Sequence, residues 1–387
     1  MRTRKDFEAI EEKILAPYAM KSKDSAGREY DELSHDIRTC YQRDRDRIVH
    51  SEAFRKLEYK TQVFVIFEGD YYRTRLTHTI EVAQIGRTIG RALRLNEDLI
   101  EAIALAHDLG HPPFGHAGEE ALNDLMKAAN FVGFNHNWRS FEIITTEKRY
   151  PQFDGLNLSK EVIVGILKHH TVYDKPTFIE KYADEGPTLE AQVVDVADSL
   201  AYLAHDIDDG LTSGCIKPKD LMENVFWQKA YGMIDPSLEN GPEEMLKYQI
   251  VKFLIDMQIK DLLKFSDQTL ASLNFQSSKD VKKYNKSVIG FSPIMSKERN
   301  SLQQLLNEKL YHHFRVERMT QKAKRIIHDL FNVYQVNPNQ LPYSVYQRGV
   351  SHNRETQYRI ICNHIASMTD RFALDEHKRL FDPYQKV

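Results

Sequence analysis

Residues 99–116 have the sequence LIEAIALAHDLGHPPFGH, in which an apolar segment runs directly into a group of histidines. The segment 99–106 is almost entirely apolar, which predicts a buried helix. Gly110 and the pair Pro112–Pro113 predict that this helix ends abruptly. Three imidazoles and one carboxylate follow within ten residues: His107, Asp108, His111 and His116. Such a cluster at the end of a buried helix indicates metal binding or proton transfer.

The dipeptide His-Asp also occurs at residues 35–36, 205–206 and 328–329, so it indicates nothing by itself. Only the copy at 107 follows a strongly apolar segment and precedes a break with further histidines. Its context, rather than its composition, makes it a candidate site.

The segment 78–95 predicts a second helix next to this stretch. Its apolar residues recur at steps of three and four: Val82, Ile85, Ile89 and Leu93. Gly86 and Gly90 lie one turn apart and would let another helix approach closely. Asn96 is a good amino-terminal cap for the helix that follows, and the acidic residues after it complement the helix dipole. We therefore expect two antiparallel helices joined by a tight corner.

Residues 190–209 predict a third, buried helix that carries an acidic stripe. Apolar side chains cover most of its circumference, but polar residues also recur at steps of three or four. The stripe consists of Asp195, Asp198, Tyr202, His205 or Asp206, and Asp209. Burying several carboxylates without partners would be prohibitive. The stripe must therefore face a cation, a set of donors or a hydrated cavity.

A divalent metal ion would satisfy His107, Asp108 and one carboxylate of this stripe together. His78, at the start of the second helix, supplies a fourth candidate ligand. Two imidazoles and two carboxylates leave an octahedral ion two open positions, for a water and a substrate oxygen. This donor set favours Mn²⁺ or Mg²⁺, with Fe or Zn as alternatives, over a closed structural zinc site.

The composition predicts a folded protein of a reducing compartment. Of the 387 residues 41% are hydrophobic, which is ample for a core, and the net charge of −3 excludes a generally basic nucleic-acid-coating protein. The three cysteines are widely separated, which argues against a disulfide framework. No segment approaches the roughly 18 apolar residues of a membrane span, and residues 1–13 do not resemble a signal peptide. We therefore expect a cytoplasmic location and no membrane partner.

The order of His78, His107-Asp108 and Asp198 resembles the H…HD…D signature of the HD phosphohydrolase superfamily. Longer blocks are similar to the deoxyguanosinetriphosphate triphosphohydrolase-like family over most of residues 40–380. These blocks are RDRDRI at 43–48, FRKL at 54–57, KTQVF at 60–64, RTRLTHT at 73–79, the stretch 107–119, and MTDRFAL at 368–374.

This resemblance implies an all-α fold, in which an HD-domain helical bundle carries additional C-terminal helices. At most a short β-hairpin is expected, over residues 62–70, where β-branched and aromatic residues precede a turn. The expected organisation is an N-terminal arm over 1–39, an HD-domain catalytic core over 40–230 and a C-terminal helical region over 231–387. That last region is either separate from the core or continuous with it.

The resemblance also implies an activity: cleavage of a dNTP between the 5′ oxygen and the α-phosphorus, which releases deoxynucleoside and tripolyphosphate. The residues that match the metal ligands are His78, His107, Asp108 and Asp198. The residues that match active-site histidines are His111, His116 and His136, with His136 as our choice of general acid. The residues that match substrate contacts are Arg75 for phosphate, and Gln62, Val63, Tyr202 and Asp206 for the region of the deoxyribose.

Two alternatives stay open. One is another HD-superfamily reaction, such as that of a nucleoside monophosphatase or a phosphodiesterase, which would use the same metal ligands on another leaving group. The other is a nucleotide-sensing or single-strand-binding protein, for which the stripe Arg315, Arg318, Lys322 and Arg325 could bind phosphates, although a solvated surface face is the favoured explanation of this stripe. The family further implies a homo-oligomer, tetramer or hexamer, and a second dNTP as activator.

Overall fold

The computed structural model describes residues 1–62, 73–170, 179–238, 242–284, 286–349 and 353–386. Over these ranges the chain is all-α, as predicted, with eighteen α-helices and no strand. Two isolated antiparallel bridges occur, Arg28 with Ser159 and Thr61 with Thr74. The predicted hairpin lies, apart from Gln62, outside the described residues, and so does Val63. No helix in the described ranges is both long and apolar enough to cross a bilayer.

The helices form three groups along the chain. The first group precedes the central bundle: α1 (Arg4–Ile14), α2 (Cys40–Val49) and α3 (Glu52–Lys56). The second includes the bundle itself: α4 (Arg75–Ala92), α5 (Glu97–Ala106), α6 (Gly115–Ala128), α7 (His136–Thr145), α8 (Lys160–Leu167) and α9 (Leu189–Thr212). The third completes the chain: α10 (Pro218–Leu221), α11 (Val225–Tyr231), α12 (Glu243–Leu273), α13 (Ser278–Lys283), α14 (Pro293–Leu306), α15 (Phe314–Val336), α16 (Tyr343–Gly349), α17 (Arg354–Ala366) and α18 (Asp370–Phe381).

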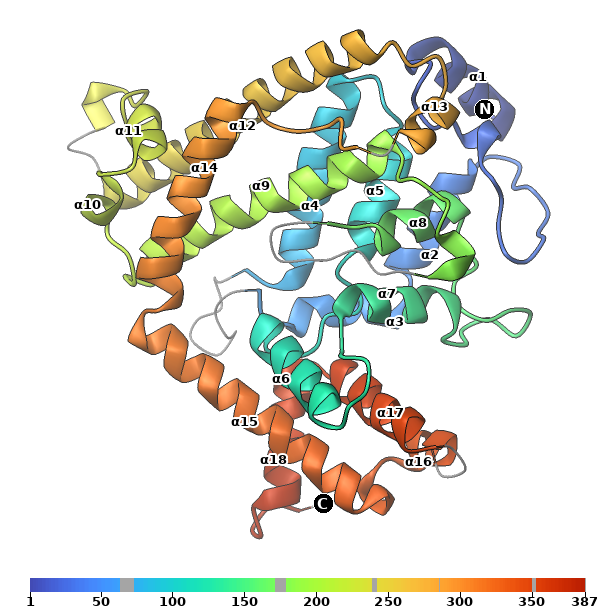
Figure 1. Ribbon diagram of the computed structural model, residues 1–387, viewed down its shortest axis with the longest axis vertical. Helices are drawn as coiled ribbons and strands as arrows, with labels where there is room; N and C mark the ends of the chain where they lie inside the picture. Colours follow the sequence, from blue (N-terminus) through green and yellow to red (C-terminus); the bar gives the residue numbers. More distant parts are fainter. Residues whose placement is uncertain (63–72, 171–178, 239–241, 285, 350–352, 387) are drawn as a thin grey trace.

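The central core is built around α4, α5 and α9, which cross in the middle of the molecule (Figure 1). The predicted corner between α4 and α5 is confirmed, because the Asn96 side chain accepts hydrogen bonds from two backbone amides of the first turn of α5. The predicted close approach at the two glycines is confirmed as well. A Cβ at Gly86 or Gly90 would lie 2.9 or 2.2 Å from the Ile100 side chain. Part of the predicted N-terminal arm also enters this core, at Leu15, Ala16, Ala19 and Met20.

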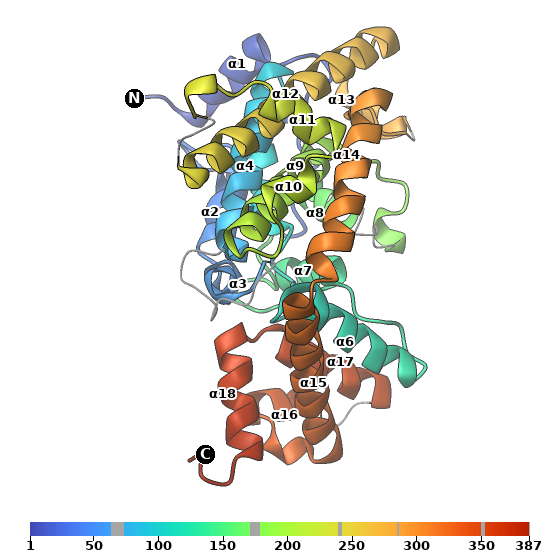
Figure 2. The same ribbon diagram turned by 90° about the vertical axis from the view of Figure 1, so that its left-hand side faces the viewer.

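A second core joins the end of α9 to α11, α12 and α14. A third core lies at the other end of the molecule, where α15 and α17 pack against α6 and α18 packs against α15 (Figures 1 and 2). Helix α6 follows the histidine-rich stretch directly, so the residues after His111 leave the central core and enter the C-terminal one. The predicted division of the chain into a core over 40–230 and a C-terminal region over 231–387 stays a prediction.

Candidate active site

Three helices of the central core bring the four expected metal ligands together. His78 lies in the first turn of α4, His107 and Asp108 at the end of α5, and Asp198 near the middle of α9. The Nε2 atom of His78 lies 3.0 Å from Asp198 Oδ1 and 4.0 Å from Asp108 Oδ2. The Nε2 atom of His107 lies 3.5 Å from Asp108 Oδ1 and 3.9 Å from Asp198 Oδ1. All four residues are buried.

The hydrogen bonds behind the two histidines determine which ring nitrogen faces the cluster. Nδ1 of His107 lies 2.6 Å from the Ala104 carbonyl oxygen, which can only accept, so this nitrogen carries the proton. Its Nε2 is buried and has no hydrogen-bond partner among the residues described. The unprotonated Nε2 of His107 therefore points at the carboxylates.

His78 also presents its Nε2 to the cluster, and the residue that orients it is His205. His205 directs Nε2 at the Glu81 carboxylate, which can only accept, so His205 carries its proton there and offers Nδ1 as an acceptor. Burial lowers the pKa of His205 to about 4, which keeps the ring neutral. Nδ1 of His78 lies 3.2 Å from this acceptor and must donate. Both ligand histidines thus present lone pairs to carboxylate oxygens, an arrangement that a divalent cation stabilises and that fits a metal site.

The charge of the cluster is balanced by Arg75, whose Nη1 lies 2.8 Å from Asp108 Oδ2. Burial alone would raise the pKa of Asp108, but the Arg75 guanidinium and the neighbouring imidazoles outweigh burial and hold the pKa well below its usual range. Nε and Nη2 of Arg75 are buried without hydrogen-bond partners among the described residues. They are available donors for an anionic substrate.

The three histidines expected to be catalytic also lie together, beside the metal cluster. The rings of His111 and His136 stack at 3.8 Å, and the ring of His116 meets His111 edge-on at 5.6 Å. Nε2 of His111 lies 3.4 Å from Asp108 Oδ1. Ligand atoms of Asp108, His111 and His136 all lie within 4.8 Å of one another. The histidine turn, by which we mean residues 109–116, therefore adjoins the metal cluster directly.

The residues expected near the sugar lie on α9 and beside it. Tyr202 and Asp206 follow Asp198 at intervals of one turn, and both are buried. Their partner is Tyr311, whose hydroxyl lies 2.9 Å from the Tyr202 hydroxyl and donates to Asp206 at 2.6 Å. Gln62 is also buried, and its Oε1 has no hydrogen-bond partner within the described part of the chain.

Comparison with known proteins places the chain in one family. The HD domain family matches residues 75–203, and the phosphohydrolase-associated domain family matches residues 289–379. A deoxyguanosinetriphosphate triphosphohydrolase-like protein of Geobacter sulfurreducens is 48% identical over 382 residues, which cover 98% of each chain. The proteins of the same name from Ralstonia pickettii and Leptospira interrogans are 46% and 40% identical, over 95% and 96% of this chain and 94% and 97% of their own. The chain belongs to the deoxyguanosinetriphosphate triphosphohydrolase-like family.

The predicted family is thereby confirmed. As an HD-type phosphohydrolase of this family, the protein is a hydrolase, and its HD domain implies a divalent metal. The buried cluster of histidines and aspartates is compatible with that metal.

His169 also lies at the candidate site, although the sequence patterns above did not single it out. Its Nδ1 lies 2.6 Å from Asp195 Oδ1, and its Nε2 lies 3.3 Å from the second oxygen of Asp198. Burial alone would lower the pKa of His169, but the two carboxylates outweigh it and raise the pKa well above its usual value. The signal was present, because α8 is an apolar helix that ends shortly before a histidine, as α5 does.

Glu119 and Tyr311 were missed as well. Glu119 accepts from the Nδ1 atom of His136 at 2.9 Å and lies 3.8 Å from Nδ1 of His116. Burial opposes ionisation of Glu119, yet these two histidines hold its pKa well below the usual range. Tyr311 ends a π-helical turn, Asn307–Tyr311, and no periodicity in the sequence marks it.

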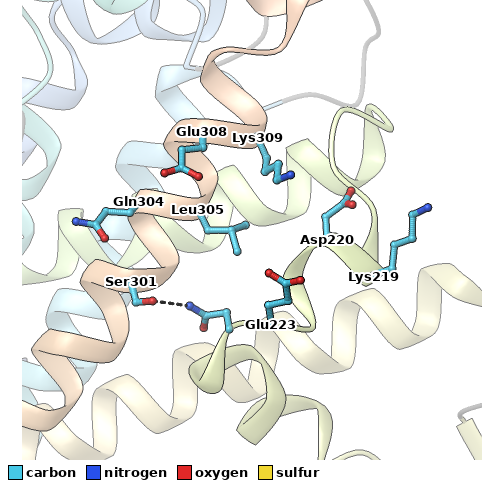
Figure 3. Close-up of a pocket in the computed structure, with 9 residues that line it drawn as sticks. Lys219, Asp220, Glu223, Ser301, Gln304, Leu305, Glu308 and Lys309 are labelled. Atoms are coloured by element: carbon cyan, nitrogen blue, oxygen red, sulfur yellow. Dashed lines mark hydrogen bonds between the residues drawn. The ribbon is translucent and has the colours of Figure 1, made fainter.

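A separate cavity of about 470 Å³ borders the outer side of this π-helical turn (Figure 3). Its walls come from α10, the link between α10 and α11, α14 and the π-helical turn, and they carry both signs of charge, including Lys219, Glu223, Glu308 and Lys309. The structure places no histidine in these walls, which separates this cavity chemically from the metal cluster.

Proposed function

We propose that this protein hydrolyses deoxynucleoside triphosphates to deoxynucleoside and tripolyphosphate, with water attacking the α-phosphorus. The observation that carries the proposal is the arrangement along α9. Asp198 belongs to the metal cluster, and Tyr202 and Asp206 follow it at one-turn intervals, so one helix spans both a phosphate-directed and a sugar-directed group. The family relationship supports the same substrate class.

A divalent ion, which we propose to be Mn²⁺ or Mg²⁺, would be held by His78, His107, Asp108 and Asp198, and would make water a better nucleophile while it offsets charge on phosphoryl oxygens. Arg75 would bind the phosphate with its available guanidinium nitrogens. A planar guanidinium suits this role because it forms charge-assisted hydrogen bonds with phosphate oxygens. Because the guanidinium also contacts Asp108, it would link the substrate to the cluster.

Protonation of the leaving 5′ oxygen is the task that we assign to the histidine turn and His136. The Glu119 carboxylate orients His136 through Nδ1 and stabilises its protonated form, which is what a general acid requires. His116 is the most accessible of the three histidines, with a side chain 40% exposed, and can approach the phosphate or the attacking water.

The sugar would meet Tyr202, Asp206 and Tyr311. Burial raises the pKa of Asp206 well above its ordinary value, and the Tyr311 hydroxyl already donates to this carboxyl group. A tightly bonded, buried group of this kind penalises a substrate hydroxyl that finds no partner, which would discriminate deoxyribose from ribose.

Product analysis tests the proposal. Purified protein with Mn²⁺ should convert at least one of the four dNTPs to deoxynucleoside and tripolyphosphate, as resolved by ion-exchange chromatography. Release of orthophosphate from a nucleoside monophosphate, with intact dNTPs, would instead support another HD-superfamily reaction and overturn ours. Binding of nucleotide or single strands without any turnover would support the sensing role.

The proposal includes the properties that the family resemblance implied for partners and location. We expect a homo-oligomer, tetramer or hexamer, in the cytoplasm, with a second dNTP as activator. The stripe formed by Arg315, Arg318, Lys322 and Arg325 is exposed along α15, as a phosphate-binding or solvated face requires. Sedimentation and a panel of dNTP pairs would test these points.

A further inference from the structure

Asp370, the first residue of α18, is completely buried although it carries a carboxylate. Its Oδ1 accepts from the backbone amide of Phe114 at 2.9 Å. Its Oδ2 accepts from the backbone amide of Thr61 at 3.0 Å and also from the Thr61 hydroxyl. A buried carboxylate costs free energy unless donors satisfy it, and here three donors converge from segments 256 and 309 residues away in the chain. The C-terminal region therefore reaches into the active site at a defined point.

Phe114 is the residue at which the histidine turn becomes helix α6. Its backbone is left-handed, with φ 65° and ψ 22°, a conformation that is unfavourable for a residue other than glycine. The side chain of Phe114 makes no capping hydrogen bond to α6, and Gly115 continues the left-handed region with φ 59°. The bond from Phe114 to Asp370 holds this conformation, and the conformation sets the direction in which His116 leaves the turn.

Lys60 fastens the other end of the turn. Its buried amine donates to the carbonyl oxygen of His111 and, at 2.9 Å, to that of Ala366, the last residue of α17. Burial lowers the pKa of Lys60 to about 7. Lys60 and Asp370 thus tie both ends of the segment 111–114 to the C-terminal helices.

We propose that Asp370 is a positioning residue for hydrolysis, which holds the turn at Phe114 so that His111 and His116 face the phosphate. The inference rests on the proposed function and extends it, because it makes turnover depend on the C-terminal region. The four metal ligands make none of these hydrogen bonds, so loss of the Asp370 carboxylate should impair turnover much more than metal binding. If Asp370 had a purely structural role, its loss would impair turnover and metal binding together.

The test compares Asp370→Asn with a matched control in the same region, Asp329→Asn. Asparagine keeps the size of Asp370 but turns an N–H group toward a donor. Asp329 is partly exposed on α15 and is bonded only to His377, at 2.9 Å, among its described neighbours. We expect Asp370→Asn to lower kcat about 10- to 100-fold, with KM and calorimetric Mn²⁺ affinity within about threefold of wild type. Asp329→Asn should leave all three unchanged.

Hydrogen exchange supplies a readout that needs no turnover. Amides of residues 109–118 should exchange faster in Asp370→Asn than in wild type, whereas those of α5 should not. If kcat is unchanged, or if Mn²⁺ affinity falls in parallel with kcat, the positioning role is wrong. If the wild type hydrolyses no dNTP, the proposed function fails. In that case, equal amide exchange at residues 109–118 in Asp370→Asn and wild type would separately overturn the role of Asp370.

Thr61→Val provides a milder variant in case Asp370→Asn does not fold. It removes one hydroxyl donor and keeps the backbone amide that also binds Asp370. We expect a three- to tenfold loss in kcat with unchanged Mn²⁺ affinity, and full kcat would count against the proposal.

Discussion

The metal cluster and the histidine turn lie side by side, but the fold holds them in different ways. The expected ligands of the cluster lie on or directly after α4, α5 and α9, three helices that share one core. The histidine turn is held from outside these helices, by Lys60, Thr61 and Asp370. The groups that we propose to bind the metal and those that we propose to transfer protons are thus held by different parts of the chain, so different substitutions should disturb them separately.

The largest effect is expected at the cluster itself. His107→Ala and Asp198→Ala should each lower dNTP turnover more than a thousandfold and abolish tight Mn²⁺ binding, because each removes a ligand. Circular dichroism should still show a helical protein. His50→Ala, at an exposed position, is the control and should behave as wild type. Undiminished turnover in both ligand variants would remove the metal assignment.

The histidine turn should break at Gly110. A Cβ there would lie 2.3 Å from the backbone oxygen of His136 and the backbone nitrogen of Ser140, and backbone atoms cannot rotate away. Gly110→Ala should therefore push α7 from the turn and separate His136 from His111, at a cost of about 100-fold in kcat and about 2 kcal/mol in the free energy of unfolding.

Gly90→Ala is the matched control for that variant, since its Cβ would meet the tip of the flexible Ile100 side chain. Steady-state kinetics and urea unfolding measure both variants. Equal kcat values for the two would contradict the idea that the turn is separately supported.

The relay from Glu81 through His205 to His78 offers a finer test of the cluster. His205→Leu removes the acceptor that keeps the proton on Nδ1 of His78, and should weaken Mn²⁺ binding about 10- to 100-fold in calorimetric titration of the metal-free protein. His205→Asn keeps an acceptor on the side chain and should lose less. Unaltered affinity in His205→Leu would show that His78 needs no such support.

The smallest expected effect is the pH dependence that Lys60 confers on stability. Its pKa is about 7 in the folded state and about 10.4 in an unfolded chain, so between these values the unfolded state binds a proton that the folded state lacks. Stability should therefore rise with pH in the wild type, by up to about 2 kcal/mol between pH 7 and pH 9. Urea unfolding should show that Lys60→Met lacks this rise, whereas Lys5→Met, at an exposed position, retains it. A wild-type stability that is flat over this range would contradict the burial of Lys60.

Local patterns in the sequence predicted the helices that build the metal cluster. The apolar run before His107, the cap at Asn96 and the stripe on α9 are all effects of neighbouring residues, so a single stretch of sequence displays them. The family motifs added the histidines at 111, 116 and 136, and the structure brings these together. The predicted substrate contact at Val63 lies outside the described residues.

The supports of the site could not be predicted in the same way. Glu81 and Tyr311 act through partners on other helices, and nothing in their own neighbourhoods distinguishes them from ordinary surface or core residues. His169 differs, because it follows an apolar helix as His107 does. His205 belongs to a His-Asp dipeptide that indicates nothing by itself, and the polar stripe of residues 190–209 left open whether His205 or Asp206 faces the site.

The sequence by itself determined the helical class and the residues able to bind a metal, because helix periodicity, capping and donor chemistry are properties of short segments. It determined the family through its resemblance to the family's motifs, which are short segments as well. Only the tertiary structure decided which nitrogen of each ligand histidine faces the cluster and which distant carboxylate holds the histidine turn. Hydrogen bonds between segments up to 309 residues apart depend on how the helices pack, and packing is a property of the whole chain.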